Sequence, residues 1–393
     1  MNENVFVAGI GMIPFTKPGA SESYDVMASK AINLALEDAG LKFDVIQQAY
    51  AGYVYGDSCS GQKAIYAAGM SGIPIINVNN NCSTGSSALY LARQAVKTGA
   101  VDCALAVGFE QMSPGALQTH FDDRVSPLAL FDETLDSLVD VDLPMALRYF
   151  GGAGLQHMRR YGTTMADFAR VRAKASRHAS NNPLSIFRKV LTEDDVMNDK
   201  VMWPGVMTRL MACPPTCGAA AAIVASSEFM RRHSLTPQVR ILSQAMTTDR
   251  PNTFDSEDMI NLAGFDVAKR AATQAYEMAG VGPEDIPVVE LHDCFAHNEV
   301  ITYEALGLCP EGGAQKLIAD GDNTYGGKFV TNPSGGLLSK GHPLGATGLA
   351  QCYELVHQLR GSAGPRQVDG ARHALQQNLG LGGACVVTVY EKC

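Results

Sequence analysis

The sequence predicts an α/β protein built from two similar βαβ halves. Strand-like apolar runs alternate with helix-period segments along nearly all of its 393 residues, a pattern typical of parallel βαβ units. One segment also occurs twice, because residues 25–40 (DVMASKAINLALEDAG) resemble residues 266–280 (DVAKRAATQAYEMAG). The closing glycines, Gly40 and Gly280, lie 240 positions apart, a period far too long for a solenoid. We therefore expect each copy to belong to its own half.

The first unit of each half follows the same order. A predicted strand at residues 5–10 leads into a predicted helix at residues 24–39, in which apolar residues recur at helical spacing. Gly40 directly after this helix is a typical helix end. In both copies an acidic residue and a predicted strand follow, at residues 48–55 in the first and 288–291 in the second.

Each half also carries a reactive side chain just before a helix. Cys82 precedes a predicted helix at residues 86–98, and His342 precedes one at residues 347–359. The two occur in the same order relative to the repeated segments. We therefore expect both side chains to lie near helix N-termini at corresponding places in the two halves.

Composition excludes several classes of function. The chain has 31 basic and 40 acidic residues, so its net charge is −9 and nucleic-acid binding is not expected. No run approaches the ~18 apolar residues of a membrane span. The N-terminus has no signal-peptide pattern, and the last residues, Glu-Lys-Cys, differ from the Ser-Lys-Leu peroxisomal signal. We expect a cytoplasmic protein whose ten cysteines are reduced.

A segment of different character separates the halves. Residues 121–142 contain seven acidic residues and one arginine, whereas Arg148–Lys189 contains nine basic residues and the single acid Asp167. Such runs are often solvated helix faces, but this one is also the best candidate for binding a polyanion. The predicted organisation is an N-terminal half at residues 1–115 and 205–250, an inserted subdomain at 116–204, and a C-terminal half at 251–393.

Several familiar motifs fail on inspection. Pro14 stands where a dinucleotide-binding loop needs its third glycine, and the Gly-Gly-Lys at residues 326–328 lacks the hydroxyl residue of a P-loop. Cys213 and Cys217 flank two prolines without a second ligand pair, so a structural turn is the better interpretation. His292-Asp293-Cys294 remains only a weak alternative for zinc.

Three segments place reactive side chains among glycine, asparagine and proline. In the first, a buried strand ends in an asparagine run before Cys82, and a helix N-terminus there lowers a thiol pKa below its free value of ~8.5. The second carries His292 and Cys294 after an apolar strand. In the third, glycines flank His342, which predicts a base for a cysteine nucleophile. Each residue alone could be structural; together they indicate covalent catalysis.

These segments resemble those of thiolases, and within them the sterol carrier protein X type. The resemblance spans Val5 to Tyr390, and its markers are NVNNNCSTGS, HDCF, YEALGLCPEG and NPSGG…SKGHPLGATG. It implies the thiolase fold, with layers in the order α-β-α-β-α. Ordinary thiolases have Asn-Glu-Ala-Phe in place of HDCF and a second cysteine where this chain has Asn378. The resemblance therefore assigns the second thiol to Cys294.

The resemblance implies a two-step acyl transfer. His342 deprotonates Cys82, which attacks a 3-oxoacyl-CoA, while Cys294 serves as the second acid and base. One oxyanion site is implied at the His342 and His292 side chains, and another at the backbone amides of Cys82 and Gly380. CoA is a co-substrate expected along the basic run Arg148–Lys189, with no metal and no other cofactor. The implied assembly is a homodimer.

Two other classes of function stay open. Some thiolase-fold relatives are lyases that cleave hydroxyacyl-CoAs by a retro-aldol reaction, often with a small partner protein. They tend to lose the thiols that this chain keeps. A non-catalytic CoA or lipid binder is the other alternative, and biosynthetic condensation uses the same residues as cleavage.

Overall fold

The computed structural model describes residues 4–114 and 121–393, and its strands form two half-sheets with the same internal order. The predicted boundary at 115/116 lies outside these residues. The N-terminal half-sheet runs β3-β2-β4-β7-β1 and the C-terminal one β10-β9-β11-β12-β8. The N-terminal strands are β1 (Val5–Met12), β2 (Gln48–Gly52), β3 (Ile75–Val78), β4 (Cys103–Glu110) and β7 (Gly218–Ser226). The C-terminal strands are β8 (Val239–Thr247), β9 (Val288–Glu290), β10 (Val330–Thr331), β11 (His373–Leu379) and β12 (Cys385–Lys392).

The half-sheets are mixed rather than purely parallel. Strand β2 is parallel to β3 and β4, and β9 is parallel to β10 and β11, as the βαβ pattern predicts. Strands β7 and β12 are antiparallel to both of their neighbours. In the C-terminal half the cause is local, because only a short turn joins β11 to β12, and short turns connect antiparallel strands.

Strand β8 belongs to the C-terminal half-sheet, although the predicted boundary at residue 250 puts it in the N-terminal half. It pairs with β12 along its full length, from Val239 to Thr247. Its pairing with β1 is confined to Phe6 and Arg240, which joins the two half-sheets at one edge. The sequence of a single strand does not indicate its partner, because strand pairing is determined by tertiary contacts with distant segments.

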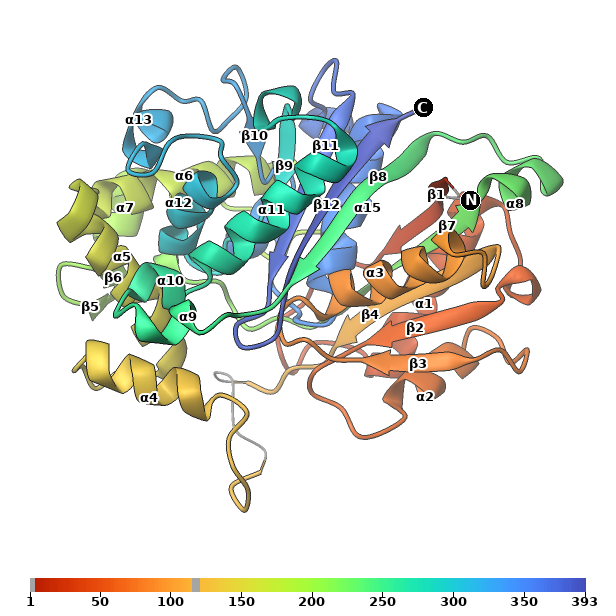
Figure 1. Ribbon diagram of the computed structural model, residues 1–393, viewed down its shortest axis with the longest axis horizontal. Helices are drawn as coiled ribbons and strands as arrows, with labels where there is room; N and C mark the ends of the chain where they lie inside the picture. Colours follow the sequence, from red (N-terminus) through yellow and green to blue (C-terminus); the bar gives the residue numbers. More distant parts are fainter. Residues whose placement is uncertain (1–3, 115–120) are drawn as a thin grey trace.

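Four long helices form the layers around the half-sheets. Helix α1 (Tyr24–Ala39) packs on β1, β7 and β4, and α11 (Phe265–Ala279) packs on β8 and β12. Helices α3 (Thr84–Lys97) and α15 (Thr347–Arg360) pack on each other in the core shared by both half-sheets. The predicted ends are confirmed, since Gly40 and Gly280 are left-handed caps with φ of 65° and 69°. This arrangement confirms the predicted α/β class (Figure 1).

Glycines allow α3 and α15 to meet at their N-terminal ends. A Cβ on Gly348 would lie 2.2 Å from Ser86 Oγ, and one on Gly85 would lie 2.6 Å from the carbonyl oxygen of Gly345. Any larger residue would push these helix starts apart. The contact therefore brings the segments before the two helices, with Cys82 and His342, to the same place.

The inserted segment packs on the C-terminal half, as the yellow-green helices at the left of Figure 1 show. Helix α5 contacts α10 and α12, and α6 contacts α12 and α14. Lys174 of α6 forms a buried ion pair with Glu299 of α12. The elements concerned are α4 (Ala129–Leu138), α5 (Met145–Tyr161), α6 (Met165–Ser180), α7 (Glu193–Met197), β5 (Val201–Trp203), β6 (Met207–Thr208), α10 (Met259–Leu262), α12 (Ala296–Ala305) and α14 (Gly336–Ser339). The remaining α-helices of the described residues are the short helices α2 (Ser60–Tyr66), α8 (Ser227–Arg232), α9 (Asn252–Asp255) and α13 (Ala314–Ala319).

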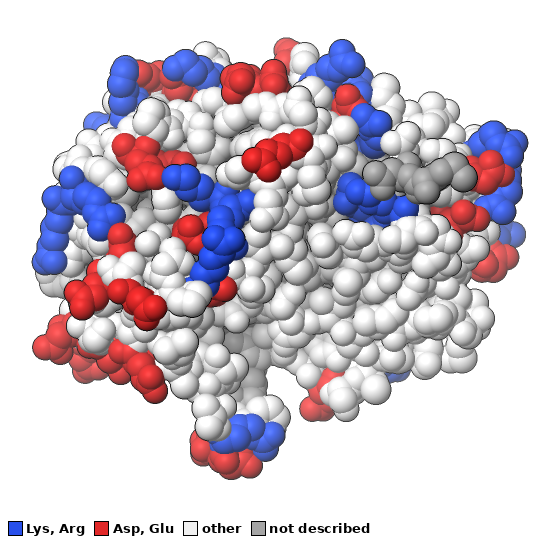
Figure 2. Space-filling model, viewed as in Figure 1, with Lys and Arg blue, Asp and Glu red and all other residues white. Residues whose placement is uncertain are grey.

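Charged side chains are unevenly distributed over the surface. Basic and acidic groups alternate over the inserted and C-terminal elements, whereas the face over α3 and β3 is almost free of charge (Figure 2). Within residues 4–114 and 121–393, every helix is too short or too polar to cross a bilayer.

Candidate active site

The structure brings Cys82, His292 and His342 together. Cys82 lies between β3 and α3, His292 is the second residue after β9, and His342 lies between α14 and α15. The Cys82 sulfur and one ring nitrogen of each histidine all lie within 4.8 Å of one another. The two imidazole rings meet edge to face, with centroids 5.0 Å apart and planes at 83°. The site is thus made by both halves of the fold.

The Cys82 thiol is protonated at neutral pH, contrary to the prediction that it titrates below its free value. Burial, with a smaller contribution from the nearby Glu110 carboxylate, raises its pKa to about 12. Its own backbone amide lowers the pKa, but by less than burial raises it. The thiol points toward Asn81 Oδ1, 3.8 Å from the sulfur. The nucleophile therefore needs a base at the moment of attack.

His342 is oriented as that base. The Thr347 hydroxyl donates to the Pro343 carbonyl at 2.9 Å, so its oxygen accepts the proton from His342 Nδ1 at 2.7 Å. The other ring nitrogen, Nε2, is buried and has no hydrogen-bond partner within the described residues. Burial lowers the pKa of the ring to about 3, so it is neutral at physiological pH. A bare, dry Nε2 can accept the thiol proton.

Cys294 lies on the same loop as His292, just outside this cluster. Its side chain is buried, and its carbonyl accepts a hydrogen bond from the Cys213 amide at 2.9 Å. Burial raises its pKa well above the ordinary value, with further contributions from Cys213 and Cys82. The loop is held by Asp293, whose carboxylate accepts the Leu337 amide at 2.7 Å. A second thiol thus stands within electrostatic reach of Cys82.

The Gly380 amide is not free to bind an oxyanion in this structure. It donates to the Ala384 carbonyl at 2.7 Å, closing the turn between β11 and β12. This bond contradicts the assignment of Gly380 as an open donor, since its proton is already used. Gly380 instead packs on the loop before Cys82, where a Cβ would lie 2.1 Å from the Asn80 carbonyl oxygen.

Glu110 is a site residue that the sequence did not single out. Its buried carboxylate accepts the backbone amides of Val54, Tyr55 and Gly345, at 3.2, 2.9 and 3.0 Å. These bonds anchor the turn after His342 to the N-terminal half. Burial raises the pKa of Glu110 to about 7. The sequence feature that could have identified Glu110 is a carboxylate at the end of an apolar strand, although its hydrogen-bond partners come from distant segments.

Two family models match the chain, a thiolase N-terminal domain over residues 5–191 and a thiolase C-terminal domain-like model over residues 249–391. Sterol carrier protein 2 of Bos taurus is 52% identical, over 100% of this chain and 73% of that protein. The chain belongs to the thiolase family. Benzoylsuccinyl-CoA thiolase subunit BbsB of Thauera aromatica is also similar, at 33% identity over 98% of this chain and 96% of that protein. These findings confirm the predicted resemblance and identify the thiolase as an acyltransferase.

Solved structures share the fold of this thiolase. An aldolase named Ltp2-ChsH2(DUF35) superposes with a TM-score of 0.83 and 22% identity, over 99% of this chain and 98% of that one. Human mitochondrial 3-ketoacyl-CoA thiolase superposes with a TM-score of 0.73 and 18% identity, over 99% of both chains. At such identities the two comparisons support the thiolase fold and leave the choice between the reactions to the site.

The basic run of this thiolase is only partly exposed. Arg172 and Lys174 are buried, where Arg172 donates to Ser339 Oγ at 2.6 Å. Arg148, Arg160 and Arg170 form ion pairs with acidic neighbours. The basic residues that remain exposed without a described ion pair are Arg159, Arg177, Arg188 and Lys189. Fewer than half of the nine cations are therefore open to a phosphate-bearing ligand.

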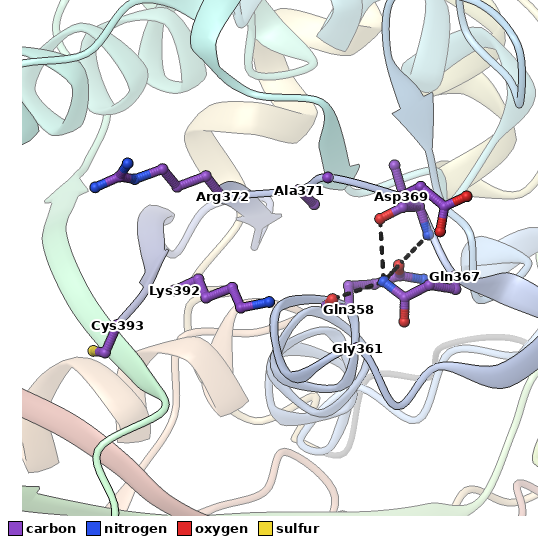
Figure 3. Close-up of a pocket in the computed structure, with 10 residues that line it drawn as sticks. Gln358, Gly361, Gln367, Asp369, Ala371, Arg372, Lys392 and Cys393 are labelled. Carbon is purple, nitrogen blue, oxygen red and sulfur yellow. Dashed lines mark hydrogen bonds between the residues drawn. The ribbon is translucent and has the colours of Figure 1, made fainter.

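A large surface pocket of this thiolase lies away from the catalytic cluster. It has a volume of about 600 Å³ and lies beside the end of β12 and the segment before β11. Arg372 and Lys392 line it, but their charged ends point in different directions (Figure 3). Because the two cations do not converge, we assign no ligand to this pocket.

The cluster of Cys82, His292 and His342 also has ligand types that zinc uses. Three ligands within 4.8 Å of one another could surround one ion. A histidine that binds a metal generally donates its other N–H to an acceptor. His342 meets this condition through Thr347, whereas His292 faces the side-chain amide of Asn378, at 3.1 Å from Nδ1.

Proposed function

We propose that this thiolase cleaves 3-oxoacyl-CoAs with CoA through an acyl-enzyme on Cys82. The observation that carries the proposal is the buried Nε2 of His342, which has no partner among the described residues and lies in the same cluster as the Cys82 thiol. A thiol with a raised pKa needs such a base, and a neutral imidazole in a dry site supplies it. His342 and His292 then line the place where negative charge develops.

The proposed first step forms a bond from Cys82 Sγ to the 3-keto carbon. His342 Nε2 takes the thiol proton, and the carbonyl oxygen becomes an oxyanion near the two imidazoles. When this intermediate collapses, the bond between C2 and C3 breaks and its electron pair goes to C2. The acyl group stays on Cys82 as a thioester, and the leaving group is the enolate of acetyl-CoA, or of propanoyl-CoA when C2 carries a methyl group.

Cys294 completes the proposed cycle. Its thiol protonates the enolate carbon and becomes a thiolate. Because burial and neighbouring thiols raise its pKa, this thiolate is a strong base and takes the proton of incoming CoA. The CoA sulfur attacks the Cys82 thioester, and the bond from the acyl carbon to Cys82 Sγ breaks to release the shortened acyl-CoA. The departing Cys82 thiolate takes back the proton held by His342, which restores the starting state. All atoms are balanced by CoA as co-substrate, and the proposed reaction calls for no metal and no further cofactor.

The proposed physiological role is lipid β-oxidation, with branched or sterol-derived acyl groups among the substrates. Similarity to sterol carrier protein 2 supports this substrate range. The exposed cations of the inserted segment support CoA binding there. The cytoplasmic location stays a prediction.

We also propose that the chain forms a homodimer through β3. Among the described residues this strand ends the order of its half-sheet, and such an unpaired edge is open to a second strand. The neighbouring face is almost free of charge (Figure 2), and the segment leading into β3 exposes Met70. Light scattering is expected to give twice the 41.8 kDa chain mass, and a monomer mass would contradict the proposal.

The activity is tested by offering the chain a medium-chain 3-oxoacyl-CoA with and without CoA. The expected products, identified by mass, are acetyl-CoA and an acyl-CoA two carbons shorter, formed in repeated turnovers only when CoA is present. A 2-methyl-branched substrate is expected to give propanoyl-CoA. Release of an aldehyde or ketone from a 3-hydroxyacyl-CoA would instead indicate the lyase, in which a small partner protein is expected. Inertness toward both substrates would favour a binding role.

A further inference from the structure

The side-chain amide of Asn378 connects His292 to the N-terminal half. Its Nδ2 lies 3.1 Å from His292 Nδ1, and its Oδ1 lies 2.8 Å from the Ser86 hydroxyl of α3. All three side chains are buried. Which end of the amide faces the imidazole decides where His292 carries its proton, and the surrounding hydrogen bonds must settle that orientation.

A backbone carbonyl fixes the direction of this chain of hydrogen bonds. The Gly348 carbonyl can only accept, and Gln376 Nε2 lies 2.6 Å from it, so the amide nitrogen of Gln376 faces Gly348. The same nitrogen lies 2.7 Å from Ser86 Oγ and donates to it. Its oxygen is left to accept from the Tyr390 hydroxyl at 2.5 Å, which agrees with this orientation.

The assignment of donors and acceptors then continues from Ser86 through Asn378 to His292. Since Ser86 Oγ accepts from Gln376, its own proton goes to Asn378 Oδ1. The Asn378 nitrogen therefore faces His292 Nδ1 and donates to it. The reverse orientation would aim two N–H groups at Ser86 and leave its hydroxyl proton without the acceptor it has now. Burial of unpaired polar groups is costly, so that orientation is disfavoured.

We propose that Asn378 is a positioning residue that holds neutral His292 with its proton on Nε2, so that this ring donates to the oxyanion. That His292 donates to an oxyanion rests on the proposed thiolase reaction. His342 has the opposite arrangement, with its proton on Nδ1 and a bare Nε2. One imidazole of the facing pair is thereby a base and the other a donor.

The same orientation bears on a metal in the cluster. A metal on His292 Nε2 would need that nitrogen bare and a proton on Nδ1, directed at an acceptor. Asn378 presents a donor there instead. Asn378 also occupies the position of the second cysteine of ordinary thiolases, which the resemblance assigns to Cys294 in this chain. The change frees this position for an amide.

Asn378→Asp tests the proposal, because a carboxylate accepts and cannot donate. At pH 8 it is expected to draw the His292 proton to Nδ1, leave a lone pair facing the oxyanion, and lower kcat by ~10²–10³-fold. As the pH falls, the carboxylate favours a second proton on His292, which restores N–H on Nε2. The variant is therefore expected to recover activity relative to the unmodified protein at low pH.

The other titratable groups around His292 are the same in both proteins. Cys82 and His342 face it across the site, and Asp293 and Cys294 follow it in the loop. The ratio of the two pH profiles thus isolates residue 378. Asn332→Asp is a matched control, since Asn332 is buried, its Oδ1 accepts the Leu291 amide at 2.8 Å, and its Nδ2 has no described partner. Its ratio to the unmodified protein is expected to be independent of pH.

An unchanged kcat in Asn378→Asp at pH 8, or a loss that does not vary with pH, would overturn the proposal. Neutron diffraction from deuterium-exchanged crystals of the unmodified protein tests it without turnover or folding of a variant. We expect deuterium on Nε2 of His292 and on Nδ1 of His342. Deuterium on Nδ1 of His292 instead would overturn the role of Asn378, even in an active thiolase. Absence of thiolase activity with the expected deuterium pattern would reject only the proposed function.

Discussion

Cys82→Ala is expected to lower CoA-dependent cleavage of a 3-oxoacyl-CoA by at least ~10⁴-fold. The substitution removes the sulfur that bonds to the 3-keto carbon, while the two imidazoles remain. None of the other described sulfurs belongs to the cluster whose ligand atoms lie within 4.8 Å. The residual rate should therefore reflect binding and charge stabilisation alone. The measurement is the initial rate of acetyl-CoA formation.

Cys59→Ala is the matched control for this experiment. Cys59 is an exposed thiol with a φ of 66°, and alanine keeps the same backbone restraint. The control is expected to keep full activity. Retention of activity by Cys82→Ala would move the nucleophile to another residue, and equal losses in both variants would point to a general effect of removing a thiol.

Cys294→Ala is expected to separate the two halves of the reaction. Acylation of Cys82 by a simple acyl thioester needs only Cys82 and its base, so it should continue. Cleavage of a 3-oxoacyl-CoA also requires a proton for the departing enolate, and this step should fall by at least ~10²-fold without the Cys294 thiol. Rapid mixing followed by mass analysis of the products measures both activities on one variant.

Cys213→Ala provides the comparison, because Cys213 is the other thiol near Cys294. Its backbone amide donates to the Cys294 carbonyl, and its sulfur contributes to the raised pKa of the Cys294 thiol. This variant is expected to keep the cleavage reaction, since the hydrogen bond from the Cys213 backbone amide to the Cys294 carbonyl does not depend on the Cys213 side chain. Loss of cleavage in Cys213→Ala with retention in Cys294→Ala would transfer the acid and base role to Cys213.

Local sequence signals were sufficient for the framework of the fold. The repeated segments ending in Gly40 and Gly280 become the outer helices α1 and α11, and each helix ends at its C-terminus in a left-handed glycine. Cys82 and His342, each placed before a helix, meet where α3 and α15 touch. These features follow from periodicity and glycine position, which are properties of short stretches of chain.

The parts that were missed depend on tertiary contacts. The pKa of Cys82 is set by burial, which outweighs the helix N-terminus, and burial cannot be seen in the residues beside it. Strand β8 joins the C-terminal half because β12, nearly 150 residues later, supplies its partner. Asn378 stood out in the sequence only as a missing cysteine. The role proposed for its amide depends on contacts with Ser86 and His292, which lie 292 and 86 residues away in the chain.

The measurement that tests the central claim most directly is the mass of the chain after mixing with a 3-oxoacyl-CoA in the absence of CoA. We expect the intact mass to increase by one acyl group, with the thioester on the peptide that contains Cys82. Addition of CoA should then remove this group and release the shortened acyl-CoA. An acyl group on any other residue, or cleavage of the substrate with the chain never modified, would contradict covalent catalysis by Cys82.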